Sequence, residues 1–312
     1  MATADLGAVL PTLSTYWHEL GQAAHAAEEA GLRYIFCNEQ PGSDAMTGAQ
    51  ALIAGTSRAH IGTSVANIYL RHPYLMARSA AMLQALSKGR FILGLGTSHD
   101  AINRPKGLGS PHPIRDMDAY VGAVRSQLAR EESTPIWLGA LRQQMTQLAG
   151  GLADGVIFHL VPVGLLRKSV AVLRAAEANA NRSGRVHVAA YARIAISSDL
   201  AHARARARNM LAFYLRFPAY QALFSAQGFA GDVEAWTRAG TASGPIAPEE
   251  AISDSLIDAT CIVGSEGRCV ERIQEYQAAG VEILLLAPVP EERASLSRLF
   301  TPAFRLARRL QQ

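Results

Sequence analysis

The chain has 312 residues, of which 49% are hydrophobic and 18% are charged, so it can bury a large core and is not an intrinsically disordered protein. The net charge is +4 and the pI about 9.1, but the basic run HARARARN at 202–209 lacks the aromatic residues that interleave a nucleic-acid-binding surface. No stretch approaches the roughly 18 consecutive apolar residues of a membrane span.

The cysteines and the N-terminus bear on where the protein works. Cys37, Cys261 and Cys269 are an odd number without CxxC spacing, so neither a disulfide framework nor a structural zinc is expected. The first residues lack the basic and then apolar segments of a secretory signal. We therefore expect a cytoplasmic protein with no metal site and no nucleic-acid or membrane partner.

Short apolar runs alternate with helical patterns along the chain, and eight of these runs predict buried strands. The strands are expected at 6–10, 34–40, 60–70, 90–97, 135–140, 154–161, 186–196 and 282–290. Helices are expected between and after them at 16–30, 44–57, 73–88, 114–129, 142–152, 164–182 and 291–309, with an irregular segment at 98–113. Glycine and proline mark several of the helix boundaries.

Eight apolar strands, each followed by helical material, predict an α/β fold of the (β/α)8 TIM-barrel type. An open doubly wound sheet is the alternative, but its GxGxxG motif is absent. The seventh and eighth strands are separated by 197–281, which we interpret as an insertion at the barrel mouth within one domain, 1–312. It contains helical patterns at 200–226 and 266–279 and a polar Gly/Pro-rich part at 238–250.

The active site of such a barrel lies where the strands end. The stretch GRFILGLGTSHD at 89–100 ends in His99, and the second strand ends in Glu39. Glu39 is either a general base or a carboxylate paired with a barrel arginine. His99 either exchanges a proton near neutral pH or caps the next segment. His159, at the end of the sixth strand, is either a ligand or a satisfied histidine at the core edge.

Four ordered blocks of the sequence resemble the luciferase-like monooxygenases, the bacterial-luciferase superfamily, over nearly the whole chain. They are HIGTSVANIYLRHPYLMARSAAMLQALSKGR at 60–90, SKGRFILGLGTSH at 87–99, PIWLGALRQQMTQLAGGLADGVIF at 135–158 and VGSEGRCVERIQEYQAAGVEILLL at 263–286. The sequence is most similar to the actinobacterial branch that uses the deazaflavin coenzyme F420. That resemblance implies a coenzyme, F420 or alternatively FMN, lying across the barrel mouth.

The resemblance also implies positions for the coenzyme. The family often has a non-prolyl cis peptide that backs the ring, and the matching bond here is Ser64–Val65. The cofactor-binding residues implied are Asn38, Ser64, Val65, Asn67, Thr97, Ser98, Asn103, Gly139, Ala140, Leu141 and Arg142. Two places depart from the family. Asn38–Glu39 replaces an acid–histidine pair, and the Gly-rich turn after the fifth strand becomes ALRQ, where Arg142 could pair with a coenzyme phosphate.

The resulting hypothesis is an F420-dependent oxidoreductase that transfers a hydride between the deazaflavin and a small organic substrate, with Glu39 and His99 as catalytic residues. The alternatives are an FMN-dependent monooxygenase and a coenzyme-binding protein without turnover. Members of the family are often dimers. The apolar run MLAFYLRFPAYQALF at 210–224 either forms a homodimer interface or covers the barrel mouth.

Overall fold

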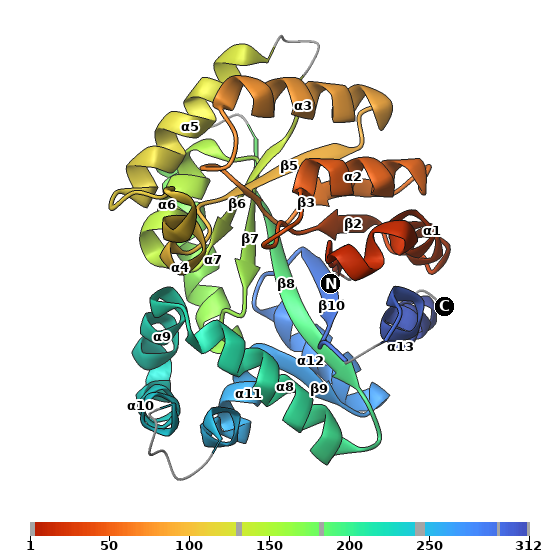
Figure 1. Ribbon diagram of the computed structural model, residues 1–312, viewed down its shortest axis with the longest axis vertical. Coiled ribbons are helices and arrows are strands. Elements are labelled where there is room, and N and C mark those ends of the chain that lie inside the picture. Colours follow the sequence, from red (N-terminus) through yellow and green to blue (C-terminus); the bar gives the residue numbers. More distant parts are fainter. Residues whose placement is uncertain (1–3, 129–132, 181–183, 241–246, 292–293, 311–312) are drawn as a thin grey trace.

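The computed structural model describes residues 4–128, 133–180, 184–240, 247–291 and 294–310. Its centre is a ring of parallel strands surrounded by helices (Figure 1). The ring consists of β1 (Asp5–Leu10), β2 (Tyr34–Cys37), β3 (His60–Thr63), β5 (Phe91–Gly96), β6 (Ile136–Ala140), β7 (Gly155–His159), β8 (His187–Ile196) and β10 (Ile283–Pro288).

The ring closes because β10 pairs with β1 on one side and with β8 on the other. All of the pairings are parallel, in the order β10-β1-β2-β3-β5-β6-β7-β8. The predicted (β/α)8 barrel is therefore confirmed. Each predicted strand has its counterpart, although the third is divided into β3 and a short β4 (Ala66–Asn67) that also pairs with β5.

The surrounding helices follow the predicted ones closely. They are α1 (Leu20–Glu29), preceded by a 3-10 turn at Ser14–Glu19, α2 (Ala45–Ala54), α3 (Pro73–Leu86), α5 (Pro113–Gln127), α6 (Gln143–Leu152), α7 (Val163–Asn179) and α13 (Leu296–Leu310). Asp44 caps α2 by accepting from the Thr47 amide, and α3 and α5 each begin at a proline, as helix N-termini commonly do. Within 98–113, the irregular segment expected from the sequence, the chain forms the short α4 (Asp100–Asn103) and a 3-10 turn.

The chain between β8 and β10 is longer than the other connections. It forms α8 (Leu200–Leu215), α9 (Pro218–Phe224), α10 (Ala230–Ala239), α11 (Asp254–Thr260), β9 (Cys261–Gly264) and α12 (Glu266–Ala278). Figure 1 shows α8 to α11 gathered on one side of the barrel. The predicted helix 200–226 is thus divided before Pro218, and residues 241–246 of the predicted polar part lie outside the description.

One strand of the structure was not predicted from the sequence. Strand β9 has only three apolar residues before Gly264, and it pairs with 193–196 at the far end of β8. The three cysteines are buried and free. Of the helices in the described ranges, none is both long and apolar enough to cross a bilayer.

The interruption between β3 and β4 is a β-bulge. Gly62 pairs with Ile92, and Ala66 pairs with Leu95, so the bulged strand uses one residue more than its partner over this interval. The Ser64–Val65 bond within it is cis, as the family resemblance implies.

Glycines of β5 and β6 make room for this bulge. A Cβ on Gly96 would lie 2.2 Å from Val65 Cγ2, and one on Gly139 would lie 3.2 Å from Val65 Cγ1. A Cβ on Gly94 would lie 1.8 Å from the Thr63 carbonyl oxygen. Gly94 and Gly96 of the GRFILGLG run are therefore required by the close approach of β3 and β4, not by a turn.

We expect Gly96→Ala to lower the free energy of unfolding by about 1–3 kcal/mol, because the added methyl group collides with Val65 in a packed core. The matched control is Gly122→Ala, in an exposed part of α5 where a Cβ would meet nothing within 4 Å. It should raise the free energy of unfolding by up to about 1 kcal/mol. Urea unfolding of both variants measures this, and equal midpoints would contradict the packing argument.

Candidate active site

A cavity of about 2010 Å³ opens at the carboxyl ends of the strands. The predicted site residues that line it are Asn38, Glu39, Ser64, Val65, Asn67, Thr97, Ser98, His99, Gly139, Ala140, Leu141 and Arg142. The fold thus brings together positions that are far apart in the sequence. Asn103 is the exception among the predicted residues.

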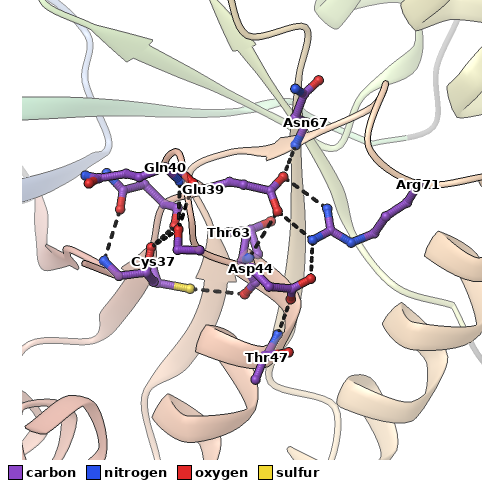
Figure 2. Close-up of polar contacts among 12 residues, drawn as sticks. Cys37, Glu39, Gln40, Asp44, Thr47, Thr63, Asn67 and Arg71 are labelled. Atoms are coloured by element: carbon purple, nitrogen blue, oxygen red, sulfur yellow. Dashed lines mark hydrogen bonds and ion pairs between the residues drawn. The ribbon is translucent and has the colours of Figure 1, made fainter. Parts of the chain in front are cut away.

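Glu39 is held by four donors. Its carboxylate accepts from both terminal nitrogens of Arg71, at 2.5 and 3.0 Å, from the Asn67 amide at 2.7 Å and from the Ala45 amide at 3.2 Å. The Glu39 side chain is 5% exposed and that of Arg71 is 10% exposed. Figure 2 shows the carboxylate between Asn67 and the guanidinium, which also reaches Asp44.

The sequence left open a base or a carboxylate paired with an arginine, and the contacts match the second. Because Glu39 joins Ala45 at the start of α2 to Asn67 just after the cis bond, it fixes the bulge relative to β2.

Asn67, on the cavity wall, and Asn103, behind it, continue the hydrogen bonds that hold the bulge. The Asn67 side chain donates to Asn103 Oδ1 at 2.8 Å, and Asn103 in turn donates to the Thr97 carbonyl at 2.9 Å. Asn103 is 1% exposed and does not line the cavity, unlike the other residues predicted to bind the coenzyme. Its amide instead links the ends of β4 and β5.

The turn after β6 presents donors to the cavity. Arg142 is an exposed residue immediately before the first turn of α6. No ion pair joins it to an acidic side chain among the described residues. Helix N-termini attract anions because their first amides lack helical acceptors. Arg142 and the start of α6 could therefore hold a phosphate, even though the family glycine is absent.

His99 is packed against an aromatic ring. Its imidazole stacks on Phe217 with ring centres 4.1 Å apart and an interplanar angle of 12°. Burial lowers the pKa of His99 to about 4, with a smaller opposing effect from Asp100. Asp100 itself points to Arg104, 2.9 Å away. His99 is therefore neutral at pH 7 and can offer an N–H or a lone pair, not a positive charge.

The opposite wall contains residues that were not among the predicted site residues. Tyr191 and Arg193 lie on β8, Tyr214 on α8, Phe217 just before α9 and Tyr220 on α9. The run 210–224 thus covers the barrel mouth, one of its two predicted roles. A charged residue inside the apolar strand AAYARIAI and aromatic residues at helical spacing were the available signals.

His159 lies at the junction of these walls. Its Nδ1 is 2.5 Å from the Tyr220 hydroxyl oxygen, whereas its Nε2 is buried without a hydrogen-bond partner. Burial keeps the pKa of His159 well below its usual value. Among the described residues, no three His, Cys, Asp or Glu side chains are arranged to hold a metal ion.

Residues 2–282 match the family model described as Luciferase-like monooxygenase. The chain belongs to this family. It is 26% identical over 310 residues to 5,10-methylenetetrahydromethanopterin reductase of Methanolobus tindarius, covering 90% of this chain and 94% of the relative. The resemblance stated from the sequence is thus confirmed, and the protein is an oxidoreductase by family.

Two solved structures share the fold. The coenzyme F420-dependent tetrahydromethanopterin reductase of Methanopyrus kandleri superposes with a TM-score of 0.81 at 19% identity, covering 98% of both chains. An F420-dependent secondary alcohol dehydrogenase in complex with an F420–acetone adduct superposes with a TM-score of 0.74 at 13% identity, covering 98% of this chain and 99% of the other. At these identities the likeness concerns the fold.

We expect the free energy of unfolding to fall as the pH is lowered from 7 to 5. His99 has a folded pKa of about 4 against 6.5 when unfolded, so the unfolded chain binds the proton first. The stabilisation is present above pH 6.5 and is lost toward pH 4, by roughly 2 kcal/mol at pH 5 for this one group.

Urea unfolding at both pH values measures this effect. His99→Phe keeps the ring stack on Phe217 but removes the titrating group, so it should lose less stability between pH 7 and pH 5 than the wild type. Equal losses in the two proteins would show that His99 is not held neutral by burial.

Proposed function

We propose that this protein is an F420-dependent oxidoreductase that transfers a hydride between the deazaflavin and a small organic substrate. The observation that carries the proposal is the large cavity at the barrel mouth, which is lined by Ser64 and Val65 of the β3–β4 bulge on one side and by Arg142 at the start of α6. The reductase relative and the two F420-dependent structures support the choice of coenzyme.

The residues present fit such a coenzyme. The cavity of about 2010 Å³ has room for a flat ring and a substrate together. Ser64 and Val65 would back the ring, Asn38 would face its polar edge, and Arg142 with the start of α6 would hold its phosphate. When bound, the deazaflavin supplies a hydride donor or acceptor.

His99 is the catalytic residue that we assign within this proposal. It lines the cavity as a neutral imidazole, so it can hydrogen-bond the oxygen or nitrogen beside the reacting carbon while charge develops there. Phe217 fixes the plane of its ring. Glu39 acts indirectly by holding the bulge in place through Asn67 and Arg71.

An FMN-dependent monooxygenase is the second candidate. Arg142 and the start of α6 favour binding of a phosphate without distinguishing the two coenzymes, and the family model is that of monooxygenases.

A homodimer remains part of the proposal, but the run 210–224 packs over the barrel mouth of its own chain. The exposed apolar residues of α3, which include Leu75, Met82 and Leu86, suit such an interface, and light scattering of the intact chain tests it.

We expect oxidised F420 to bind at least ten times more tightly than FMN. Titration of each into the protein, followed by absorbance, measures this. Loss of the deazaflavin absorbance on adding a panel of alcohols would support hydride transfer, as would its loss from reduced coenzyme on adding enones or imines. Oxygen-dependent consumption of reduced FMN would support the monooxygenase, and binding of either coenzyme without turnover would contradict both.

Glu39→Gln and His99→Ala should have different effects. Glu39→Gln weakens the contact with Arg71 and loosens the bulge, so it should lower the free energy of unfolding by about 1–3 kcal/mol and weaken F420 binding. His99→Ala should leave F420 affinity within a few-fold and lower kcat by about a hundredfold to a thousandfold, the loss of one oriented hydrogen bond. The assignment fails if His99→Ala has wild-type kcat or if Glu39→Gln binds F420 normally.

A further inference from the structure

Arg193 is a buried cation that has no carboxylate partner in the part of the chain that the structure describes. The residue is 8% exposed, and its guanidinium contacts the Tyr214 hydroxyl and the faces of Tyr191 and Tyr214, 4.8 and 5.5 Å from the ring centres. Its Nε has no hydrogen-bond partner. Across the described ranges, no Asp or Glu forms an ion pair with it.

Two other arginine side chains with little exposure face acidic residues. Arg71 faces Glu39 and Asp44, and Arg272, also buried, faces Glu275. Burying a cation without an opposite charge is costly, and aromatic faces compensate only part of that cost. Because Arg193 lines the cavity, the missing anion can come from a molecule bound there.

A second unsatisfied donor or acceptor lies beside Arg193. His159 Nε2 is buried without a partner, and its ring lies 4.3 Å from that of Tyr191 and 4.9 Å from that of Tyr214. These are the same two rings that flank Arg193. His159 also lines the cavity, so the two unsatisfied side chains share one aromatic surrounding on its wall.

The order of the strands separates this wall from the bulge. Around the closed ring, β3 reaches β8 through β5, β6 and β7 in one direction and through β2, β1 and β10 in the other. Arg193 is thus directly across the barrel from Ser64–Val65. A ring backed by the bulge would turn its free face toward β8, where the substrate must lie for hydride transfer.

We propose that Arg193 and His159 form the substrate subsite, which binds a carboxylate attached to a planar or apolar body. The edge of the Arg193 guanidinium that carries the free Nε can donate two parallel hydrogen bonds to the two oxygens of a carboxylate. The neutral His159 can add one hydrogen bond. Phe217 and the tyrosines of this wall would contact the planar or apolar body of the substrate. The inference rests on the proposed function, because it names the substrate class of the same site.

The test measures binding without turnover, by calorimetry with benzoate and with benzamide, which has the same shape but no charge. The wild type should bind benzoate at least ten times more tightly than benzamide. Arg193→Met should weaken benzoate binding at least tenfold and change benzamide binding less than twofold. Arg193→Lys keeps the positive charge but loses the two parallel N–H donors of the guanidinium, so it should retain part of the preference for benzoate.

Arg115→Met is the matched control, because Arg115 lines the same cavity with a 74% exposed side chain and its loss changes the net charge equally. It should bind benzoate as the wild type does. Equal affinities for benzoate and benzamide, no measurable benzoate binding, or wild-type benzoate affinity in folded Arg193→Met and Arg193→Lys would each overturn the proposal.

The F420 affinity of the same variants shows whether Arg193 binds an anionic group of the coenzyme or the carboxylate of the substrate. Arg193→Met should bind F420 within threefold of the wild type. If F420 binding fell tenfold while benzoate binding stayed unchanged, the anion would belong to the coenzyme and the substrate subsite would be refuted. If the wild type failed to bind F420 but bound benzoate through Arg193, the subsite would stand and the proposed coenzyme would not.

Discussion

The buried ion pair between Glu39 and Arg71 is the contact around which the site is organised. A carboxylate with two guanidinium bonds and two backbone bonds is strongly oriented, and it joins the end of β2, the start of α2 and the strand beyond the cis bond. An unpaired charge at this depth would be costly. The pair therefore maintains the close approach that Gly96 and Gly139 allow around Val65.

The barrel itself was predictable because parallel strands covered on both faces consist of almost unbroken apolar runs. Strand β9 was not predicted because only three apolar residues, Cys261 to Val263, precede Gly264, too few to distinguish a strand from a loop. The division of the helix before Pro218 has a local cause, because a proline ends a helix at the residues before it. Helix α4 has only four residues, too few for a helical pattern in the sequence. The bulge followed only from the resemblance, since nothing in ANIY at 66–69 or GTS at 62–64 distinguishes it from a regular strand.

The sequence predicted the location of the site more reliably than the roles of its side chains. Strand ends located the cavity wall, but the role of Glu39 depended on Arg71, 32 residues later, whose partner no local pattern could name. Asn103 is buried and does not line the cavity, and its side chain accepts a hydrogen bond from that of Asn67. Arg193 lies inside a strand where a charge is unexpected, and only the closed ring shows that it faces the cavity rather than a helix.

The two sides of the cavity are built from chain segments of different kinds. The bulge, the Glu39–Arg71 pair and the α6 turn lie on regular strand–helix units and share closely packed backbone. The opposite wall joins β8 to α8 and α9, whose aromatic side chains contact His99 and His159. Changes in α8 and α9 could alter the pocket around Arg193 without disturbing the contacts that hold the bulge. A barrel arranged in this way can keep one coenzyme geometry while its substrate wall varies.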